Sequence, residues 1–367
     1  MGNLAFNPPL IFNPTSYYGT VDTVENTTGN LPPGSLNQSL DPHSKNVAIY
    51  HLSFGVQRNV GFDTVLDVAY VGSLGRHLAR TVQLNTVPYG SQFLPQNQDP
   101  SRPGNPLPDN FFRPYPGYGN IPYMTNDANS SYHSLQSQVK RRFSRGLQFG
   151  ASWTWAKNMG YTGAATYNSW PVWNYGKLDV DRTHVFTLHY LWDIPKLSQI
   201  KSNKITRSVF DGWQLSGITS FISGQPTGVS ISASPTVNFT GGGDGARPIM
   251  IANPVLPKSE RTFYRYCNTD AFAEPAIGDR GNAPVEVFRG PGVNNWNTSL
   301  FKNFKVSERL SFQLRGEAYN TFNHTQFSAV NTSLQFNAQG KQINAQAGRL
   351  TAARDSRIIQ VALRVRF

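Results

Sequence analysis

The side chains that most often carry out chemistry are present in this chain, but they are scattered along it. Histidine occurs seven times, and none lies at a recognised metal-binding spacing from another histidine, a cysteine or a carboxylate. His184 and His189 form the closest pair, and a separation of five residues would place them on opposite faces of a strand. The sequence therefore predicts no metal site. The remaining histidines are His43, His51, His77, His133 and His324.

Three short motifs could suggest catalysis or phosphate binding. Cys267 is the single cysteine, which rules out an internal disulfide, and no paired base accompanies it, so it is interpreted as a bystander thiol. DRTH at 181–184 offers an acid and a histidine without a matching nucleophile motif, and is interpreted as a strand entry with ion pairs. GGGDG at 241–245 lacks the Lys-Ser/Thr of a phosphate loop and is interpreted as a flexible outer loop. The sequence thus predicts no catalytic or cofactor-binding residue, no cofactor, and a protein that is not an enzyme.

The sequence shows a repeated alternation of apolar and polar residues, which is the pattern of β-strands with one apolar and one polar face. No window approaches the roughly 18 apolar residues of a membrane-spanning helix, which excludes a helical membrane protein. The alternating segments lie at 46–58 and 62–70, 133–143 and 147–155, 184–192 and 212–221, 295–304 and 309–322, and 357–367.

The terminal segment, RIIQVALRVRF, has the most regular alternation. Its apolar face ends on an aromatic residue, whereas its other face carries two arginines and a glutamine. Outer-membrane barrels characteristically end in such a strand, which the barrel assembly machinery recognises. We therefore predict an outer-membrane assembly signal formed by Ile359, Val361, Leu363, Val365 and Phe367.

The connections between these segments alternate in length. Three are short, at 59–61, 144–146 and 305–309, and a fourth, at 195–209, is longer and basic. Those between pairs are long and rich in Gly, Pro, Asn and Ser, at roughly 79–131, 158–181, 224–293 and 324–355. Long structureless loops are unusual in a compact soluble domain. Short periplasmic turns alternating with long outer loops are typical of outer-membrane barrels.

The directions of the predicted strands suggest that the barrel contains further strands outside this chain. If the last strand ends on the periplasmic side, counting back gives an odd number, and a bacterial single-chain barrel has an even one. The N-terminus also lacks the basic start and apolar segment of a secretory signal. We therefore expect a fragment or truncated product. It would comprise a loop-like segment at 1–45 and part of a barrel, about 9–12 strands, at 46–367, without a plug domain.

Polar side chains in the middle of the strands require water or ion pairs. In a barrel these side chains would line the lumen, and we predict this for Gln313, Arg315, Glu317 and Arg364. Aromatic residues near strand ends fit the girdles at the membrane interfaces. They are Tyr50, Tyr70, Trp153, Trp155, Tyr190 and Trp192. The alternative is a soluble β-domain with an ordinary aromatic core.

The net charge of +12 would favour nucleic acid or an anionic surface as partner of a soluble domain. The basic residues cluster at two of the predicted turns, however, and no recognised nucleic-acid module is visible. A solvated periplasmic rim is therefore favoured, with no nucleic-acid partner. The first cluster is Lys140, Arg141, Arg142 and Arg145, and the second is Lys196, Lys201, Lys204 and Arg207.

A series of stretches in order resembles the C-terminal barrel of TonB-dependent outer-membrane receptors, in particular the Oar-like branch. The most extended are SYHSLQSQVKRRFSRGLQFGASWTWAK (131–157), RGPGVNNWNTSLFKNF (289–304) and ERLSFQLRGEAYNTFNHTQF (308–327). Shorter ones are SLGRHL (73–78), DRTHVFTLHYLWDIP (181–195), GWQLSGITSFISGQP (212–226) and NTDAFAEP (268–275), followed by the terminal strand. The resemblance covers most of residues 44–367.

The resemblance implies a barrel of about 22 strands with an N-terminal plug, in the outer membrane of a Gram-negative cell. It implies outer-membrane lipid and the assembly machinery as partners, and energised uptake of a small or peptide ligand. The TonB system would act only through the plug, which this chain lacks. The resulting prediction is an all-β, antiparallel transmembrane barrel segment of a transporter. The alternative is a soluble β-rich binding or structural protein, and the ligand stays unnamed: a sugar, a peptide and a chelated metal are all compatible with the loops.

Overall fold

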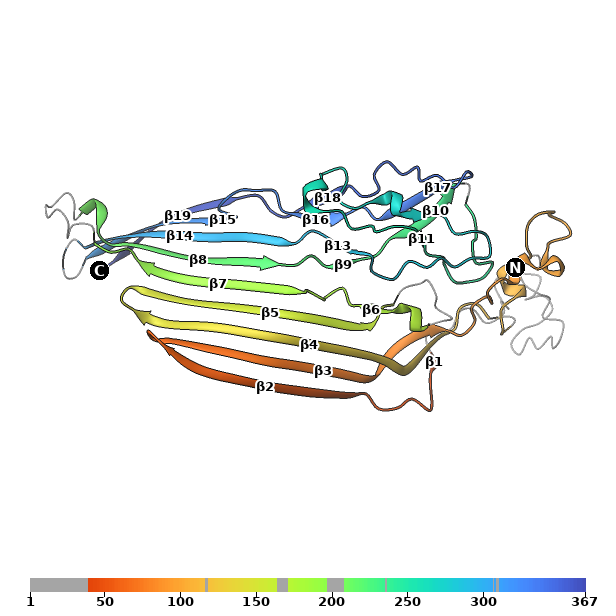
Figure 1. The fold of residues 1–367 in the computed structure, drawn as a ribbon, viewed down its shortest axis with the longest axis horizontal. Helices are drawn as coiled ribbons and strands as arrows, with labels where there is room; N and C mark the ends of the chain where they lie inside the picture. Colours follow the sequence, from red (N-terminus) through yellow and green to blue (C-terminus); the bar gives the residue numbers. More distant parts are fainter. Residues whose placement is uncertain are drawn as a thin grey trace, which may run out of the picture.

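Nine long strands form the body of the protein (Figure 1). The computed structural model describes residues 39–115, 118–163, 171–196, 208–234, 236–305, 307 and 310–367. Each long strand pairs antiparallel with its neighbour in the sequence, so the predicted up-and-down all-β order is confirmed. The strands are β2 (Ala48–Gly61), β3 (Thr64–Gln83), β4 (Pro122–Ser144), β5 (Leu147–Tyr161), β7 (His184–Asp193), β8 (Trp213–Ile222), β14 (Val293–Lys305), β15 (Ser311–Tyr319) and β19 (Ile358–Arg366).

Two of the short connections are two-residue turns. Phe62 and Asp63 join β2 to β3, while Arg145 and Gly146 join β4 to β5, and all four residues have positive φ. Positive φ at both central residues defines the type I′ turn, whose twist matches that of the flanking strands. The first turn lies later than the predicted 59–61, because β2 continues through Gly61.

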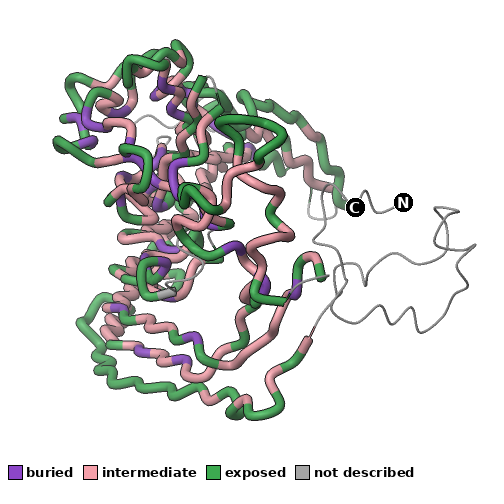
Figure 2. Tube along the Cα trace, turned by 90° about the vertical axis from the view of Figure 1, so that its right-hand side faces the viewer, coloured by how far each residue is buried: buried purple, intermediate pink, exposed green. Residues whose placement is uncertain are grey.

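The sheet is not closed among the described residues. Two short strands extend it: β1 (Ser39–Leu40) pairs parallel with β4, and β6 (Tyr175–Lys177) pairs with β5. These bring the sheet to 11 strands, with β2 at one edge and β19 at the other. Seen from the loop end, the chain follows an open arc (Figure 2). The first 38 residues of the predicted N-terminal segment 1–45 lie outside the described ranges.

Strand register divides the sheet into two faces. One face carries a continuous polar row across seven strands, formed by Gln57, Asp67, Gln138, Ser152, Thr187, Ser220 and Asn295. The other face carries apolar side chains that remain largely exposed: Phe54 is 74% exposed and Val361 70%. Apolar side chains in such numbers are not left in water by a folded protein, because their burial is the main favourable term in folding. The exposed apolar face is therefore the one that contacts lipid.

The predicted long connections are present, and they carry secondary structure of their own. They contain four small two-stranded sheets that gather at one end of the long strands (Figure 1). The pairs are β9 (Pro226–Thr227) with β13 (Phe288–Arg289), β10 (Ser230–Ser234) with β17 (Ser333–Asn337), β11 (Ile249–Met250) with β12 (Phe272–Ala273), and β16 (Phe327–Val330) with β18 (Leu350–Ala353). Short 3-10 turns lie at Ser91–Phe93, Pro95–Asn97, Asp109–Phe111, Pro171–Asn174, Lys258–Glu260 and Thr269–Ala271.

The buried apolar core of the described chain lies in these connections rather than on the large sheet. Ala271, Phe272, Leu334 and Phe336 are almost fully buried together. Val229, Ile231, Val287 and Ala347 pack against them. We name the folded connections around this core the loop cap. Within the described residues, no helix is long and apolar enough to cross a membrane.

Candidate ligand path and outer cavity

The four residues predicted to face a lumen share the polar face of the last strands. Gln313 lies directly opposite Arg364, and Glu317 lies opposite Gln360. The Gln313 side-chain amide donates to Asn303 Oδ1 at 2.9 Å, and Arg315 Nε donates to Gln313 Oε1 at 2.8 Å. The first bond links β15 to β14 and the second lies within β15, both on the face of the sheet that carries the polar row.

The terminal stripe lies on the opposite, apolar face. Its residues pair with apolar or small residues of β15, as in Leu363 with Leu314 and Val365 with Phe312. Val361 lies opposite Gly316, at which an added Cβ would meet no other atom within 4 Å. The predicted alternation of β19 is therefore confirmed. Its role as an assembly signal stays a prediction.

Aromatic side chains form a ladder across the apolar face near the loop cap. Phe186, Phe221, Trp296 and Phe322 follow one another with ring centroids 5.6–6.0 Å apart. On β14, Trp296 and Phe304 are eight residues apart, which corresponds to about 26 Å along a strand. That separation is close to the roughly 25 Å apolar band of membrane barrels, so the two aromatics fit opposite girdles. Of the six residues predicted for girdles, Tyr50, Tyr70, Trp155 and Trp192 are exposed.

The DRTH motif anchors the loop cap to the sheet. Asp181 is almost fully buried. Its Oδ2 accepts from Arg289 Nη2 at 2.5 Å, and its Oδ1 accepts the Asn158 backbone N–H at 2.6 Å. Arg289 also donates to the carbonyl oxygen of Gly224. The interpretation of DRTH as a strand entry with ion pairs is confirmed, and the partner that the sequence could not reveal is Arg289, 108 residues away.

The glycine run GGGDG lies in a loop, as predicted, and this loop is packed against the β3–β4 connection. Backbone N–H groups of Gln92 and Gly243 donate to the carbonyl oxygens of Gly241 and Val87, at 2.9 and 3.0 Å. A Cβ on Gly241, which has a φ of +57°, would meet the Phe93 ring at 2.5 Å. Glycine is required here because the β3–β4 connection approaches too closely for a side chain.

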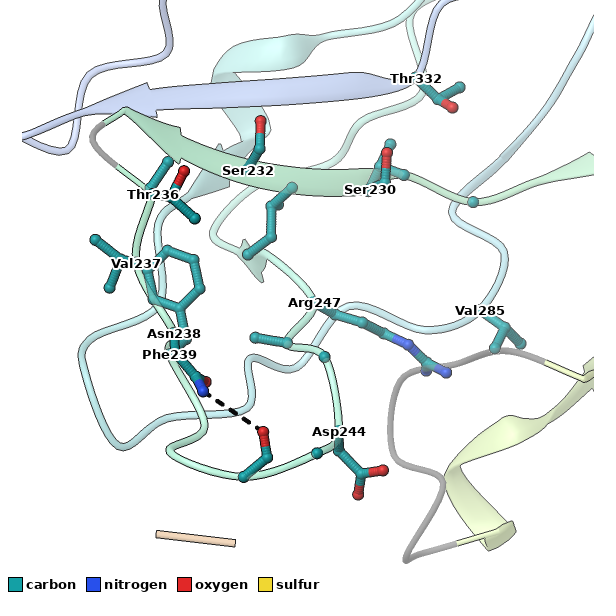
Figure 3. Close-up of a pocket in the computed structure, with 18 of the residues that line it drawn as sticks. Ser230, Ser232, Thr236, Val237, Asn238, Phe239, Asp244, Arg247, Val285 and Thr332 are labelled. Carbon is teal, nitrogen blue, oxygen red and sulfur yellow. Dashed lines mark hydrogen bonds between the residues drawn. The ribbon is translucent and has the colours of Figure 1, made fainter. Parts of the chain in front are cut away.

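A cavity of about 770 Å³ opens beside this glycine run in the loop cap (Figure 3). That volume is in the range of small-molecule and peptide pockets. Its walls are β10 with the residues before it, the stretches 236–239 and 242–247, and Pro284, Val285 and Thr332. The Arg247 guanidinium, which lines it, donates to the carbonyl oxygens of Trp173 and Ala283. Sequence reasoning missed this cavity, because its walls come from segments about 100 residues apart.

Cys267 is buried in the loop cap. Burial raises the pKa of its thiol to about 11, so the thiolate is disfavoured at physiological pH. Its interpretation as an unreactive thiol fits this surrounding. Among the described residues, no group of three or more His, Cys, Asp or Glu side chains is placed to hold a metal ion.

The two predicted basic clusters differ in how much of them is described. Lys140, Arg141, Arg142 and Arg145 lie at or beside the tight β4–β5 turn, where Arg141 donates to the Ser144 carbonyl oxygen. Of the second cluster, Lys196 is described and exposed. Lys201, Lys204 and Arg207 lie outside the described residues.

Solved structures with partial similarity are outer-membrane proteins. The outer membrane transporter YddB from Escherichia coli has 10% identity and a TM-score of 0.44, covering 92% of this chain and 34% of that chain. The ferric-catecholate import receptor Fiu from Escherichia coli has 11% identity and a TM-score of 0.40, covering 89% of this chain and 28% of that one. The FrpB iron transporter from Neisseria meningitidis has 10% identity and a TM-score of 0.39, covering 89% and 32%. The chain thus spans about a third of the length of these proteins.

The family assignment comes from the sequence of almost the whole chain. No curated protein is similar enough in sequence to count as a relative. The family model of the outer membrane β-barrel domain, in contrast, matches residues 3–360. Together with the antiparallel strands and the exposed apolar face, this decides against the soluble alternative. The chain belongs to the outer membrane β-barrel family, and it resides in the outer membrane of a Gram-negative type of cell.

Proposed function

We propose that the chain is the C-terminal barrel segment of a TonB-dependent outer-membrane receptor of the Oar-like branch. In this role it takes part in energised uptake of a ligand across the outer membrane. The observation that carries the proposal is the polar row that crosses seven strands on one face of the sheet. Because lipid covers the opposite face, the polar face would line a water-filled path. The loop cap and its cavity would form the ligand-receiving end.

The edges of β2 and β19 have no further partner strand among the described residues, which supports a barrel that is completed by further strands. A plug domain, through which TonB would act, would come with them. Gln313, Arg315, Glu317 and Arg364 would then line the path. The terminal stripe from Ile359 to Phe367 would be read by the barrel assembly machinery, and cell fractionation after deletion of Phe367 tests that role.

Cysteine labelling in whole cells that carry the complete receptor, with its plug and remaining strands, tests the path and its energy coupling. Glu317→Cys and the neighbouring Leu314→Cys, each combined with Cys267→Ser, compare the polar and apolar faces of the same strand. We expect a membrane-impermeant maleimide to label position 317 and not 314. Labelling at 317 should slow when the proton-motive force is collapsed or tonB is deleted.

The two parts of the proposal fail separately in this assay. Equal labelling at both positions, or none at 317, would contradict a water-filled path along this face. Labelling at 317 that does not respond to the loss of TonB or of the proton-motive force would contradict energised uptake while leaving the path intact.

A further inference from the structure

The cavity in the loop cap lies along an unpaired strand edge. β10 pairs in parallel with β17 only, and their two-stranded sheet has no third member among the described strands. Residues 228–233, which include most of β10, line the cavity in an unbroken run. Figure 3 shows the stretch from Thr236 to Phe239, together with Asp244 and Arg247, on the side of β10 away from β17.

The pairing register determines which backbone groups of β10 point into the cavity. The backbone N–H of Ser230 points toward the β17 side, because it donates to the Thr332 carbonyl oxygen at 3.1 Å. In a parallel pair, alternate residues of a strand direct both N–H and C=O to the same side. Ile231 and Ala233 therefore direct theirs away from β17. Within the described part of the chain, these groups of Ile231 and Ala233 have no hydrogen-bond partner.

Unpaired backbone groups at a strand edge are a template for another strand. The N–H and C=O groups of Ile231 and Ala233 recur every two residues, about 6.6 Å apart. The backbone of an extended peptide repeats its donors and acceptors at the same interval, whereas a sugar ring does not. The geometry matches a peptide main chain.

The residues that line the cavity indicate which side chains a bound peptide would carry. Ser230, Thr236 and Thr332 carry hydroxyl groups, and Val237, Phe239 and Val285 provide apolar walls. The Ser232 hydroxyl instead donates to the carbonyl oxygen of Leu334 on β17. The charges of Asp244 and Arg247 are opposite, and Arg247 is bonded within the loop cap. An uncharged peptide with small apolar and hydroxyl side chains fits this lining better than a strongly charged one.

We propose that the loop cap captures an extended, uncharged peptide segment by adding it as a strand to the free edge of β10. β10 has five residues, about 17 Å of extended chain, so the peptide would pair over four or five residues. The inference that such a peptide is the ligand taken up by the protein rests on the proposed function. Capture itself requires only the folded loop cap.

Binding of blocked pentapeptides to the refolded full chain in detergent micelles tests the proposal. The probes are fluorescein-labelled peptides of alternating Val/Thr, Ala/Ser and Tyr/Gly, each paired with a twin that is N-methylated at alternate residues. N-methylation keeps the side chains but removes the donors that pair with β10. We expect at least one peptide to bind, and its twin to bind about tenfold or more weakly.

Variants of β10 separate backbone pairing from side-chain recognition. Ala233→Pro removes an N–H that faces the cavity and leaves the ladder to β17 intact, so binding should be lost. Ser232→Ala removes only a hydroxyl, so affinity should change less than about threefold. If Ala233→Pro prevents folding, the N-methylated twins still decide the question in the unaltered chain.

Several results would overturn the proposal. They are equal binding of the twins, no binding by any peptide, displacement of the peptide by maltohexaose, or loss of binding in Ser232→Ala alone. Because the readout is binding, it does not depend on TonB or on transport. A failure of energised labelling at position 317 therefore leaves this test standing, and a failure here leaves the labelling result standing.

Discussion

Asp181 joins the end of β5 to the loop cap through a buried ion pair. Replacing it by Asn keeps an acceptor for the Asn158 N–H but removes the charge that faces Arg289. Breaking a buried pair from one side is strongly destabilising, although the Arg289 side chain retains 28% exposure. We expect Asp181→Asn to lower the free energy of unfolding by about 2–3 kcal/mol. Urea unfolding of the refolded chain in lipid vesicles, followed by tryptophan fluorescence, measures this.

A matched control exists in the connection between β8 and β14, which also contains Arg289. Asp270 approaches Arg265 at 4.0 Å, and both side chains are exposed. Because water screens such pairs, Asp270→Asn should change the stability by less than about 1 kcal/mol. Equal effects of the two substitutions would contradict the anchoring role of Asp181.

Cys267 allows a pH-dependent prediction. Its folded pKa of about 11 compares with an ordinary value of 9.0, so below pH 9 the folded chain holds about a hundredfold less thiolate than the unfolded chain. We expect iodoacetamide at pH 8 to alkylate the folded chain at least about a hundredfold more slowly than the urea-unfolded chain. The unfolded thiol loses its proton first, so stability should fall as pH rises from about 9 to about 11. Similar alkylation rates in both states would show that the thiol is accessible.

At the scale of the element, β14 offers adjacent residues on opposite faces. Leu300 lies on the apolar face, midway between Trp296 and Phe304, whereas Ser299 lies opposite Glu317 on the polar face. An arginine at the lipid-facing midplane costs about 2–4 kcal/mol. We therefore expect Leu300→Arg to destabilise the refolded chain in vesicles by that amount, and Ser299→Arg to be close to neutral. If the two faces were assigned in reverse, Ser299→Arg would be the damaging change in the same unfolding assay.

The long strands could be predicted because lipid on one face and water on the other impose strict alternation over eight or more residues. β19 shows this in IIQVALRVR, and all nine long strands were predicted in order. Their ends were not, since the polar residues past the membrane carry no such pattern. β4, for example, begins at Pro122, well before the alternation predicted from residue 133.

The loop cap escaped prediction for physical reasons. Its strands have two to five residues, too short for a recognisable period, as in Pro226–Thr227 and Ser230–Ser234. Their partners are remote in sequence, and local residue types do not determine which remote segment will pair. The glycine run illustrates this: glycine indicates a loop from sequence alone, yet Gly241 is held against Phe93.

For the whole molecule, the open arc between β2 and β19 predicts a dependence on further strands. An unpaired edge strand promotes aggregation. We expect this chain alone to refold in detergent micelles, but its two open edges should leave it without the SDS resistance of a closed barrel, so that it gives no compact band that shifts on boiling in a gel. Addition of the strands that complete the barrel should produce such a band. A heat-modifiable band from the chain alone would mean that it closes a barrel by itself or as an oligomer, and folding without detergent would contradict the membrane assignment.

The parallel pairing of β10 with β17 also has a consequence for the order of folding. Ser232 and Leu334 meet across 102 residues, and the whole of β14 and β15 lies between them. Closing so long a stretch is entropically costly unless intervening contacts have already brought its ends together. The strands in the membrane shorten that search, so the loop cap becomes ordered only after they have inserted. Before insertion its apolar residues are uncovered, so we expect the chain to need chaperones until it reaches the bilayer.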